Sequence, residues 1–378
     1  MDNSIVTGFK EISQLKTRAA KNIKSSRIGI GFETLDREMF KPEKCYDAIA
    51  RAGVKWARCQ TGWSRCEKVK GQLDFAWLDE VVENLLIRGI QPWFNVGFGN
   101  KLYMPDAPHD SAVGCVPLYY PKETQDAWRR FASELAKHFQ GRIRHYEIWN
   151  ECNIDCFWRP GKSSAREYSQ LVEMTSAEIK AVDPHALVVA CVAGVPNDFI
   201  LGTLKAGIGK SIDCYSIHPY QGQIPEANYA VGIANLRHLF AKYAPHIKLW
   251  QGECGCPSQT LGHHDEWLGL YNMDETKQAK WLLRRLLTDL ALDFDYVSYF
   301  HATDLMENEY RQANGQVRPP VMMGVLHGKV YTPKKSFHSL SWLCSLFDAD
   351  THCAPLFTRC FLHHLGHSRL SAQSLQCA

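Results

Sequence analysis

Two carboxylates that each follow a short apolar stretch are the residues of this chain best suited to chemistry. Glu151 lies in the stretch RHYEIWNECN, residues 144–153, where bulky strand-forming side chains end at Asn150. Glu253 follows a second apolar stretch, residues 247–251, after one glycine. A carboxylate beside a buried strand is costly unless it lies at the open end of that strand. Active sites collect at the carboxyl ends of parallel strands, so we expect both carboxylates at one site.

The chemistry that such a pair supports is the hydrolysis of a glycosidic bond. Double displacement needs two carboxyl groups about 5–5.5 Å apart, one protonated to donate to the leaving oxygen and one ionised to attack the anomeric carbon. We interpret Glu151 as the acid. A like-charged neighbour raises the pKa of the acid and keeps it protonated near neutral pH. A separation of about 9 Å would favour inversion instead.

The elements that must position this pair repeat along the chain as a short apolar run, a polar loop and an amphipathic helix. The predicted strands lie at 28–32, 54–59, 90–96, within 144–153, and at 186–193, 212–217, 247–251 and 296–300. The predicted helices are 42–52, 75–88, 125–139, 164–182, 199–206, 230–243, 276–291 and 335–347, and the fourth begins with a capping box at 164–167. Such alternation implies parallel strands with right-handed crossovers. The predicted fold class is α/β, a (β/α)8 TIM barrel.

The predicted domain organisation is one catalytic barrel with short extensions. The barrel covers residues 27–347, after a polar and basic N-terminal arm at 1–26. Residues 348–378 show no clear period and are interpreted as a tail or a truncated module, without a clear C-terminal β-sandwich. The arm has no apolar core typical of a signal peptide, and no run is long enough to span a membrane.

Composition excludes several classes of protein. The net charge of +3 over 378 residues provides no basic field for nucleic acid. Fourteen cysteines could form a disulfide scaffold, but a chain of this length can bury a core without one. We therefore expect free cysteines and a cytoplasmic location. The expected partner is an oligosaccharide or glycoside, with no nucleic acid and no membrane, and a homo-oligomer remains open.

Several motifs resemble those of clan A retaining glycoside hydrolases. Trp149-Asn150-Glu151, with Asn153 shortly after, resembles the WNEPN signature, although Cys152 replaces the usual proline. The stretch WQGECG at 250–255 resembles the nucleophile strand of the clan, with a cysteine in the aromatic position. Together with the motifs below, this resemblance extends over about residues 28–347, and the nearest families are glycoside hydrolase family 39 and similar bacterial families.

Two further motifs carry the same resemblance. His218-Pro219-Tyr220 resembles the His-x-Tyr motif of the sixth strand, and Arg58 matches the arginine of the second strand. The resemblance implies that Glu151 is the acid/base and Glu253 the nucleophile. It also implies that Asn150 binds the sugar 2-hydroxyl, while the remaining matched residues give support. Those supporting residues are Arg58, His218 and Tyr220.

Other polar and aromatic residues at strand ends could contact a sugar or could simply pack. This set consists of Glu33, Trp63, Asn95 and His301. Cys152, Cys156, Cys254 and Cys256 could be considered as zinc ligands with His263 and His264, but no C-x₂-C pair has a matching partner. We therefore predict no metal and no cofactor. An oxidation-sensitive thiol at Cys254 is left open.

The predicted function is a retaining glycoside hydrolase that acts on β-glycosidic bonds. An exo-acting, β-xylosidase-like enzyme for short oligosaccharides is the first choice. An endo-glycanase, or an exo-glycosidase for galactose or a uronic acid, is the alternative among enzymes. A catalytically silent glycan-binding barrel is the alternative outside enzymes, although an intact carboxylate pair argues against it.

Overall fold

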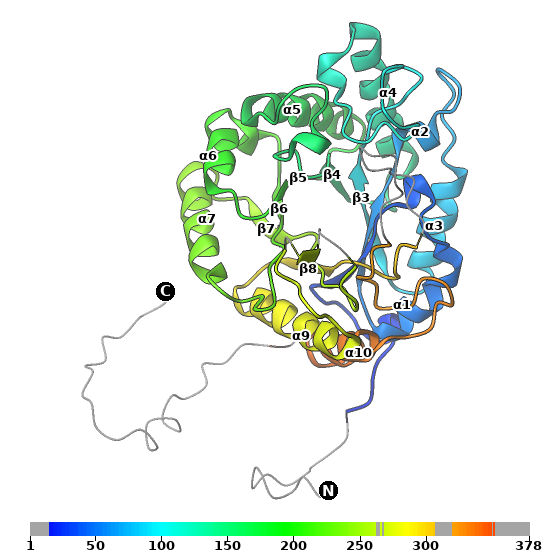
Figure 1. The fold of residues 1–378 in the computed structure, drawn as a ribbon. Coiled ribbons are helices and arrows are strands. Elements are labelled where there is room, and N and C mark those ends of the chain that lie inside the picture. Colours follow the sequence, from blue (N-terminus) through cyan, green and yellow to red (C-terminus); the bar gives the residue numbers. More distant parts are fainter. Residues whose placement is uncertain (1–14, 262–264, 267, 307–319, 350, 352–378) are drawn as a thin grey trace, which may run out of the picture.

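Eight parallel strands close into a barrel in the computed structural model, as Figure 1 shows. The structure describes residues 15–261, 265–266, 268–306, 320–349 and 351. Each strand pairs with the next in sequence, and β8 pairs with β1 to complete the ring. The strands are β1 Ile28–Phe32, β2 Trp56–Gln60, β3 Gln91–Val96, β4 His145–Ile148, β5 Leu187–Ala193, β6 Cys214–His218, β7 Lys248–Gln251 and β8 Tyr296–Tyr299. The predicted (β/α)8 barrel is confirmed.

Helices alternate with the strands and surround the barrel on the outside (Figure 1). They are α1 Tyr46–Ala52, α2 Trp63–Cys66, α3 Ala76–Leu86, α4 Lys122–His138, α5 Ala165–Val182, α6 Asn197–Lys205, α7 Tyr229–Tyr243, α9 Glu275–Ala291 and α10 Lys335–Leu346. The Ser164 half of the predicted capping box is confirmed, because its side chain accepts a hydrogen bond from the backbone N–H of Glu167. The Glu167 carboxylate accepts from the Tyr119 hydroxyl instead of bonding back to Ser164. None of the described helices combines the length and apolar character needed to cross a membrane.

The first predicted helix, 42–52, is wrong in its amino-terminal part. Residues Pro42–Lys44 form a separate 3₁₀ turn, η4, and α1 begins only at Tyr46. The short helix α2 after β2 was not predicted, because four residues are too few to show a helical period.

Two kinds of side chain fill the barrel interior. Near the amino ends of the strands lies an aromatic layer, in which the Trp93 indole donates to the Tyr296 hydroxyl at 2.9 Å. Near the carboxyl ends, charged side chains such as Arg58 and Glu147 are fully buried. The aromatic layer consists of Trp56, Trp93, Val189, Cys214, Trp250 and Tyr296. The interior therefore changes from apolar to charged toward the carboxyl ends.

The predicted arm and tail lie mostly outside the described residues. The described part of the arm, residues 15–26, packs on the barrel: Ala20 and Ile23 are buried, and Lys55 at the start of β2 donates to the Ala20 carbonyl. Arg18 forms an ion pair with Asp348 at 2.8 Å. The division into arm, barrel and tail remains a prediction.

Candidate active site

Glu151 and Glu253 converge on one histidine at the carboxyl end of the barrel. His218, the last residue of β6, places its Nδ1 atom 3.1 Å from Oε1 of Glu151 and 3.7 Å from Oε2 of Glu253. One oxygen of each carboxylate and one nitrogen of the ring all lie within 4.8 Å of one another. Both carboxylates keep a small exposed fraction, 12% for Glu151 and 13% for Glu253. The pair is therefore close together and open to a ligand.

The turn that presents Glu151 leaves the strand at once. Trp149 and Glu151 have φ values of 67° and 45°, in the left-handed region that residues other than glycine seldom adopt. Cys152 donates through its thiol to the Cys191 carbonyl at 3.2 Å. Asn153 accepts from the backbone N–H of Ala193 and donates to its carbonyl. These bonds attach the turn to β5, so Cys152 anchors the position where relatives carry proline.

Glu253 is held by one donor on each oxygen. Arg58 Nη1 lies 2.7 Å from Oε2, and the Tyr220 hydroxyl donates to Oε1 at 2.8 Å. Burial raises the pKa of Tyr220 well above its ordinary value, so this residue remains a neutral donor. Charge-assisted bonds of this kind are shorter and stronger than neutral ones, and they fix the orientation of the carboxylate.

Arg58 is the centre of the buried charge network. Its guanidinium binds both oxygens of Glu147, at 2.5 and 3.1 Å, and Glu33 at 3.1 Å. Burial alone would lower the pKa of Arg58, but the surrounding carboxylates hold it well above its ordinary value. Burial raises the pKa of Glu33 to about 8. Glu33 therefore carries a proton near neutral pH, which reduces the excess of negative charge around one guanidinium.

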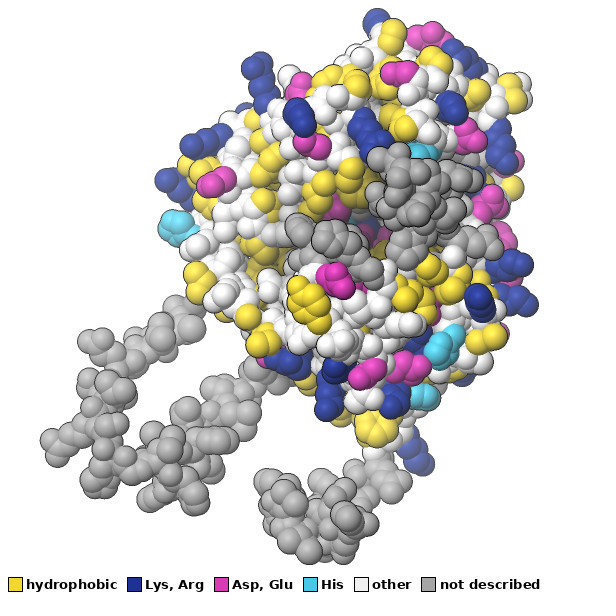
Figure 2. All heavy atoms as spheres, in the orientation of Figure 1, with side chains coloured by type: hydrophobic (Ala, Val, Ile, Leu, Met, Phe, Trp, Pro, Cys, Tyr) yellow, Lys and Arg dark blue, Asp and Glu magenta, His cyan; other side chains and the backbone are white. Residues whose placement is uncertain are grey.

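Asn150, Glu33 and Glu253 line a cavity at the carboxyl end of the barrel, and Glu151 is not among its lining residues. Its volume is about 180 Å³. Arg58 Nη2 donates to Asn150 Oδ1 at 2.9 Å, so the amide nitrogen is the end of Asn150 that can donate to a substrate hydroxyl. In Figure 2, acidic side chains are visible at the bottom of a hollow near the centre of the face shown. The cavity is lined by Glu33, Thr34, Arg37, Met39, Gln60, Phe98, Asn150, Phe157, Glu253, Phe300, Leu305 and Val321.

The other predicted residues lie behind this cavity or away from it. Asn95 is buried and donates to the Trp149 carbonyl at 2.6 Å, below the catalytic turn. His301 lies 3.0 Å from the Glu33 carbonyl oxygen, and burial lowers its pKa to about 4. Trp63 packs in the core, where its indole donates to Glu67 and its ring stacks on an aromatic neighbour. The structure therefore does not bring Trp63 to the cavity.

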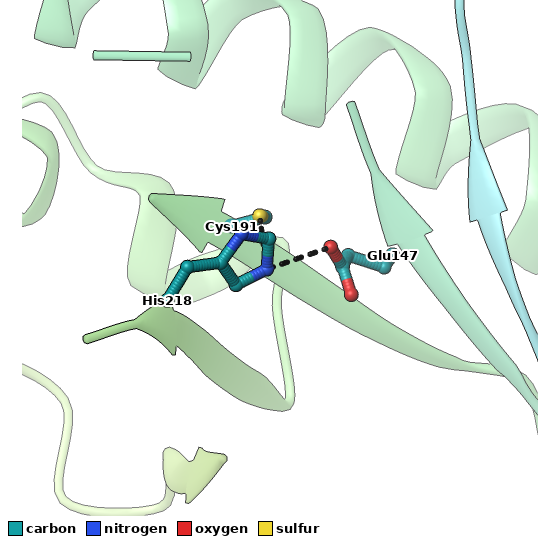
Figure 3. Close-up of side chains that lie close together, drawn as sticks. All are labelled: Glu147, Cys191 and His218. Carbon is teal, nitrogen blue, oxygen red and sulfur yellow. Dashed lines mark hydrogen bonds and ion pairs between the residues drawn. The ribbon is translucent and has the colours of Figure 1, made fainter. Parts of the chain in front are cut away.

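Glu147 and Cys191 belong to the site and were missed from the sequence. Figure 3 shows both side chains close to His218. Cys191 Sγ lies 3.3 Å from Nε2 of His218, and Glu147 Oε1 lies 3.9 Å from the same nitrogen. A carboxylate within a buried strand needs a partner, and that rule could have identified Glu147. No comparable signal marks Cys191, because a cysteine in a strand is ordinary core filling.

Among the described residues, two groups of side chains could bring donors together around a cation. They are Glu147, Cys191 and His218, and Glu151, His218 and Glu253. In the first group Arg58 already engages both oxygens of Glu147, and its charge would repel a metal ion. Burial also raises the pKa of Cys191 well above its ordinary value, whereas metals bind the thiolate. In the second group Glu253 lines the cavity, and its carboxylate and that of Glu151 would be needed for acid–base work.

Two of the cysteines considered as zinc ligands, Cys152 and Cys254, use their thiols as donors to backbone carbonyls. Cys254 is buried and donates to the Pro219 carbonyl at 3.3 Å. Burial raises its pKa well above the ordinary value, which argues against an oxidation-sensitive thiol. His263 and His264 lie outside the described residues. Every cysteine in the described part of the chain is free.

The chain is similar to proteins of one glycosidase family. Residues 52–225 match the family model for glycosyl hydrolases family 39. A beta-xylosidase of Geobacillus stearothermophilus is 28% identical over 174 residues, which is 42% of this chain and 32% of that protein. The beta-galactosidase BgaA of Clostridium cellulovorans is 37% identical over 68 residues, which is 17% of this chain and 10% of that protein. The matched segments thus span about a third or less of the length of these curated relatives.

Solved structures resemble the whole barrel. A family 39 glycoside hydrolase from Bacteroides cellulosilyticus WH2 has a TM-score of 0.64 at 21% identity, covering 85% of this chain and 63% of that one. Xylanase 10B from Thermotoga petrophila RKU-1 has a TM-score of 0.58 at 15% identity, covering 88% and 98%. Identities this low show the fold alone. The chain resembles clan A glycoside hydrolases, and family 39 in particular, in both sequence and fold.

Proposed function

We propose that this chain is a retaining glycoside hydrolase of the family 39 type, which cleaves β-glycosidic bonds by double displacement. The observation that carries the proposal is the closeness of Glu151 and Glu253, whose oxygens approach within 4.8 Å at the carboxyl ends of β4 and β7. An inverting enzyme keeps its two carboxyl groups roughly 6.5–9.5 Å apart to admit a water between them. Two carboxylate oxygens within 4.8 Å of each other support direct attack by one carboxylate.

The reaction proceeds in two steps, through an intermediate in which the sugar is bonded to Glu253. Glu151 gives its proton to the glycosidic oxygen as the bond from that oxygen to the anomeric carbon breaks, and an oxygen of Glu253 bonds the same carbon. Water then attacks the anomeric carbon, its proton returns to Glu151, and the bond to Glu253 breaks. Two inversions at one carbon give net retention. The chain needs no cofactor for these steps.

The residues around Glu253 prepare it for attack. Arg58 and Tyr220 each donate to one of its oxygens, so a donor remains on the second oxygen when the first bonds the sugar. The amide nitrogen of Asn150 can donate to the 2-hydroxyl, where bonds strengthen in the transition state. Glu33, protonated near neutral pH, offers the sugar a donor as well as an acceptor.

The shape of the cavity supports an exo-acting enzyme for short oligosaccharides. The cavity is small, about 180 Å³, and the aromatic side chains of Phe98, Phe157 and Phe300 contribute to its walls. Carbohydrate rings pack their apolar faces on such side chains. A pocket of this size favours one sugar ring over a long chain. The similarity to a beta-xylosidase supports a β-xyloside as the first substrate to try.

A panel of aryl glycosides tests the proposal. We expect the wild type to cleave aryl β-xylosides with retention, and Glu253→Ala to be inactive until azide restores turnover with an inverted glycosyl azide as product. Glu151→Ala should spare substrates with good leaving groups far more than natural ones. Glu123→Ala, at an exposed carboxylate paired with Lys70, is the matched control and should behave as wild type.

Three outcomes would count against this assignment. Unchanged hydrolysis in both active-site variants would remove the catalytic roles of Glu151 and Glu253. Binding of sugars without turnover of any aryl glycoside would favour a glycan-binding barrel. Release of long internal fragments from a polysaccharide would favour an endo-glycanase.

A further inference from the structure

A buried thiol lies directly behind the proposed acid/base. Cys191 on β5 is fully buried, and its Sγ atom lies 3.3 Å from Nε2 of His218 (Figure 3). The backbone N–H of Glu151 donates to the same sulfur at 3.5 Å. The other ring nitrogen of His218, Nδ1, lies 3.1 Å from Glu151 Oε1. Cys191 is therefore connected to Glu151 twice, once through the backbone and once through the imidazole.

The protonation states restrict how these groups can bond. Burial lowers the pKa of His218 to about 4 and raises that of Cys191 well above its ordinary value. Near neutral pH the ring is therefore neutral and the thiol keeps its proton. A neutral imidazole has one N–H donor and one bare acceptor nitrogen. Glu147 Oε1, at 3.9 Å from Nε2, is too distant for a hydrogen bond with the ring, so the thiol is the nearer partner of this nitrogen. The Glu147 carboxylate is a second acceptor for the Cys191 S–H group, but Arg58 already donates to both of its oxygens.

The electrostatic surroundings of this chain of bonds come from several strands. Burial has the largest effect on His218 and opposes a charged imidazole, as does Arg58, while Glu253 and Glu147 favour it. The titratable and charged groups around His218 and Glu151 are Arg58 on β2, Glu147 on β4, Cys191 on β5, Tyr220 after β6 and Glu253 after β7.

We propose that Cys191 is a positioning residue for the acid/base, because its S–H group donates to Nε2 of His218 and so keeps the ring proton on Nδ1, facing Glu151. The proposal rests on the proposed function for the role of Glu151. Oε1 of Glu151 then accepts the Nδ1–H bond, and the proton to be transferred is carried by Oε2. After the transfer, the same N–H group stabilises the carboxylate that must take a proton from water.

The tautomer of His218 is a direct test that needs no turnover. Nitrogen NMR of wild-type protein with isotope-labelled histidine, with His218 assigned by comparison with His218→Asn, should show the proton on Nδ1. A proton on Nε2 would overturn the proposal, because the thiol could then not be the donor to that nitrogen. The tautomer is read from the wild type, and His218→Asn serves only for the assignment, so the result does not depend on how the Cys191 variants fold.

The pH profile of kcat/KM tests the consequence for Glu151. In Cys191→Ala the ring proton can move to Nε2, and the bare Nδ1 then disfavours the carboxylate form of Glu151. We expect the basic limb to move to higher pH by about one unit, the size of one charge-assisted hydrogen bond. Cys191→Ser keeps a donor and should return the limb toward the wild-type position. Cys214→Ala, at a buried cysteine in the aromatic layer, is the matched control and should leave the limb in place.

The possible results separate this proposal from the proposed function. An unmoved limb in Cys191→Ala, or an equal movement in Cys214→Ala, overturns the role of Cys191 while the glycosidase assignment stands. If the wild type cleaves no glycoside, the glycosidase assignment and the role of Cys191 in it both fail. The tautomer of His218 then shows only whether the Cys191 thiol donates to the imidazole.

Discussion

The aromatic layer and the charged layer of the barrel interior lie on the same strands but obey different rules. On β2, Trp56 belongs to the first layer and Arg58, two residues later, to the second. On β4, His145 contacts the aromatic layer and Glu147 binds Arg58. Residues i and i+2 of a strand share a face, so both layers point into the barrel.

The difference teaches how one barrel carries both stability and chemistry. In the aromatic layer, the edge-to-face contact between Trp93 and Trp250 has ring centroids 5.2 Å apart. Each contact of this kind stabilises the fold independently of the others. In the charged layer, each group depends on the others, because an unpaired buried charge is very costly. We therefore expect substitutions in the first layer to reduce stability and those in the second to remove activity.

The largest expected effect comes from Arg58→Met. It leaves the carboxylates of Glu147, Glu33 and Glu253 without their shared cation, so we expect a loss of about 3–5 kcal/mol in the free energy of unfolding together with a loss of activity. Denaturant unfolding and an aryl-glycoside assay measure both. Arg285→Met, which breaks a buried pair with Asp289 away from the cavity, is the control and should lose stability but keep turnover. Equal activity in the two variants would contradict the division into layers.

Trp250→Ala should show the opposite pattern. Removal of a large aromatic side chain from a packed core typically costs about 3–5 kcal/mol. Trp250 contacts Trp93 and Tyr296 in the aromatic layer, so kcat per folded molecule should stay near that of the wild type. Thermal unfolding measures the loss of stability, and kcat measured on the folded fraction shows whether turnover is kept. A large fall in kcat without a fall in stability would contradict the assignment of stability to the aromatic layer and of activity to the charged layer.

Tyr220→Phe tests a single hydrogen bond of the charged layer. The variant loses the donor on Glu253 Oε1, and we expect kcat/KM to fall roughly 10–100-fold with little change in stability. Tyr215→Phe removes a buried hydroxyl on β6 that contacts Thr203 of α6, and it is the matched control. Similar kinetics in both variants would show that the Tyr220 bond does not serve catalysis.

The last expected effect is a change in the pH dependence of stability, which builds up gradually over several pH units. Glu33 has a pKa of about 8 in the folded protein against an ordinary 4.5. Between these values the folded state binds more protons than the unfolded state, so this group makes stability fall as the pH rises. Glu33→Gln should remove that fall, which is at most about 1.4 kcal/mol per pH unit. Denaturant unfolding from pH 5 to about 8 compares the two proteins, and parallel curves would contradict the raised pKa.

Local patterns were sufficient for the strands, most helices and the two carboxylates. The alternation of apolar runs and amphipathic stripes depends on near neighbours, so the strand bounds agree with the structure to within about two residues. Trp63 shows where the pattern fails. It follows a strand as Glu151 does, but α2 turns it into the core, and so short a helix has no sequence period.

The sequence by itself determined the eightfold repeat and the carboxylates that close its fourth and seventh strands. Only the tertiary structure decided which side chains meet around them. Cys191, His218 and Glu151 come from different strands, and closure of the barrel sets the stagger that brings them within bonding distance. The protonation of Glu33 likewise depends on burial and on the charges around it, which arise only when distant strands surround one guanidinium.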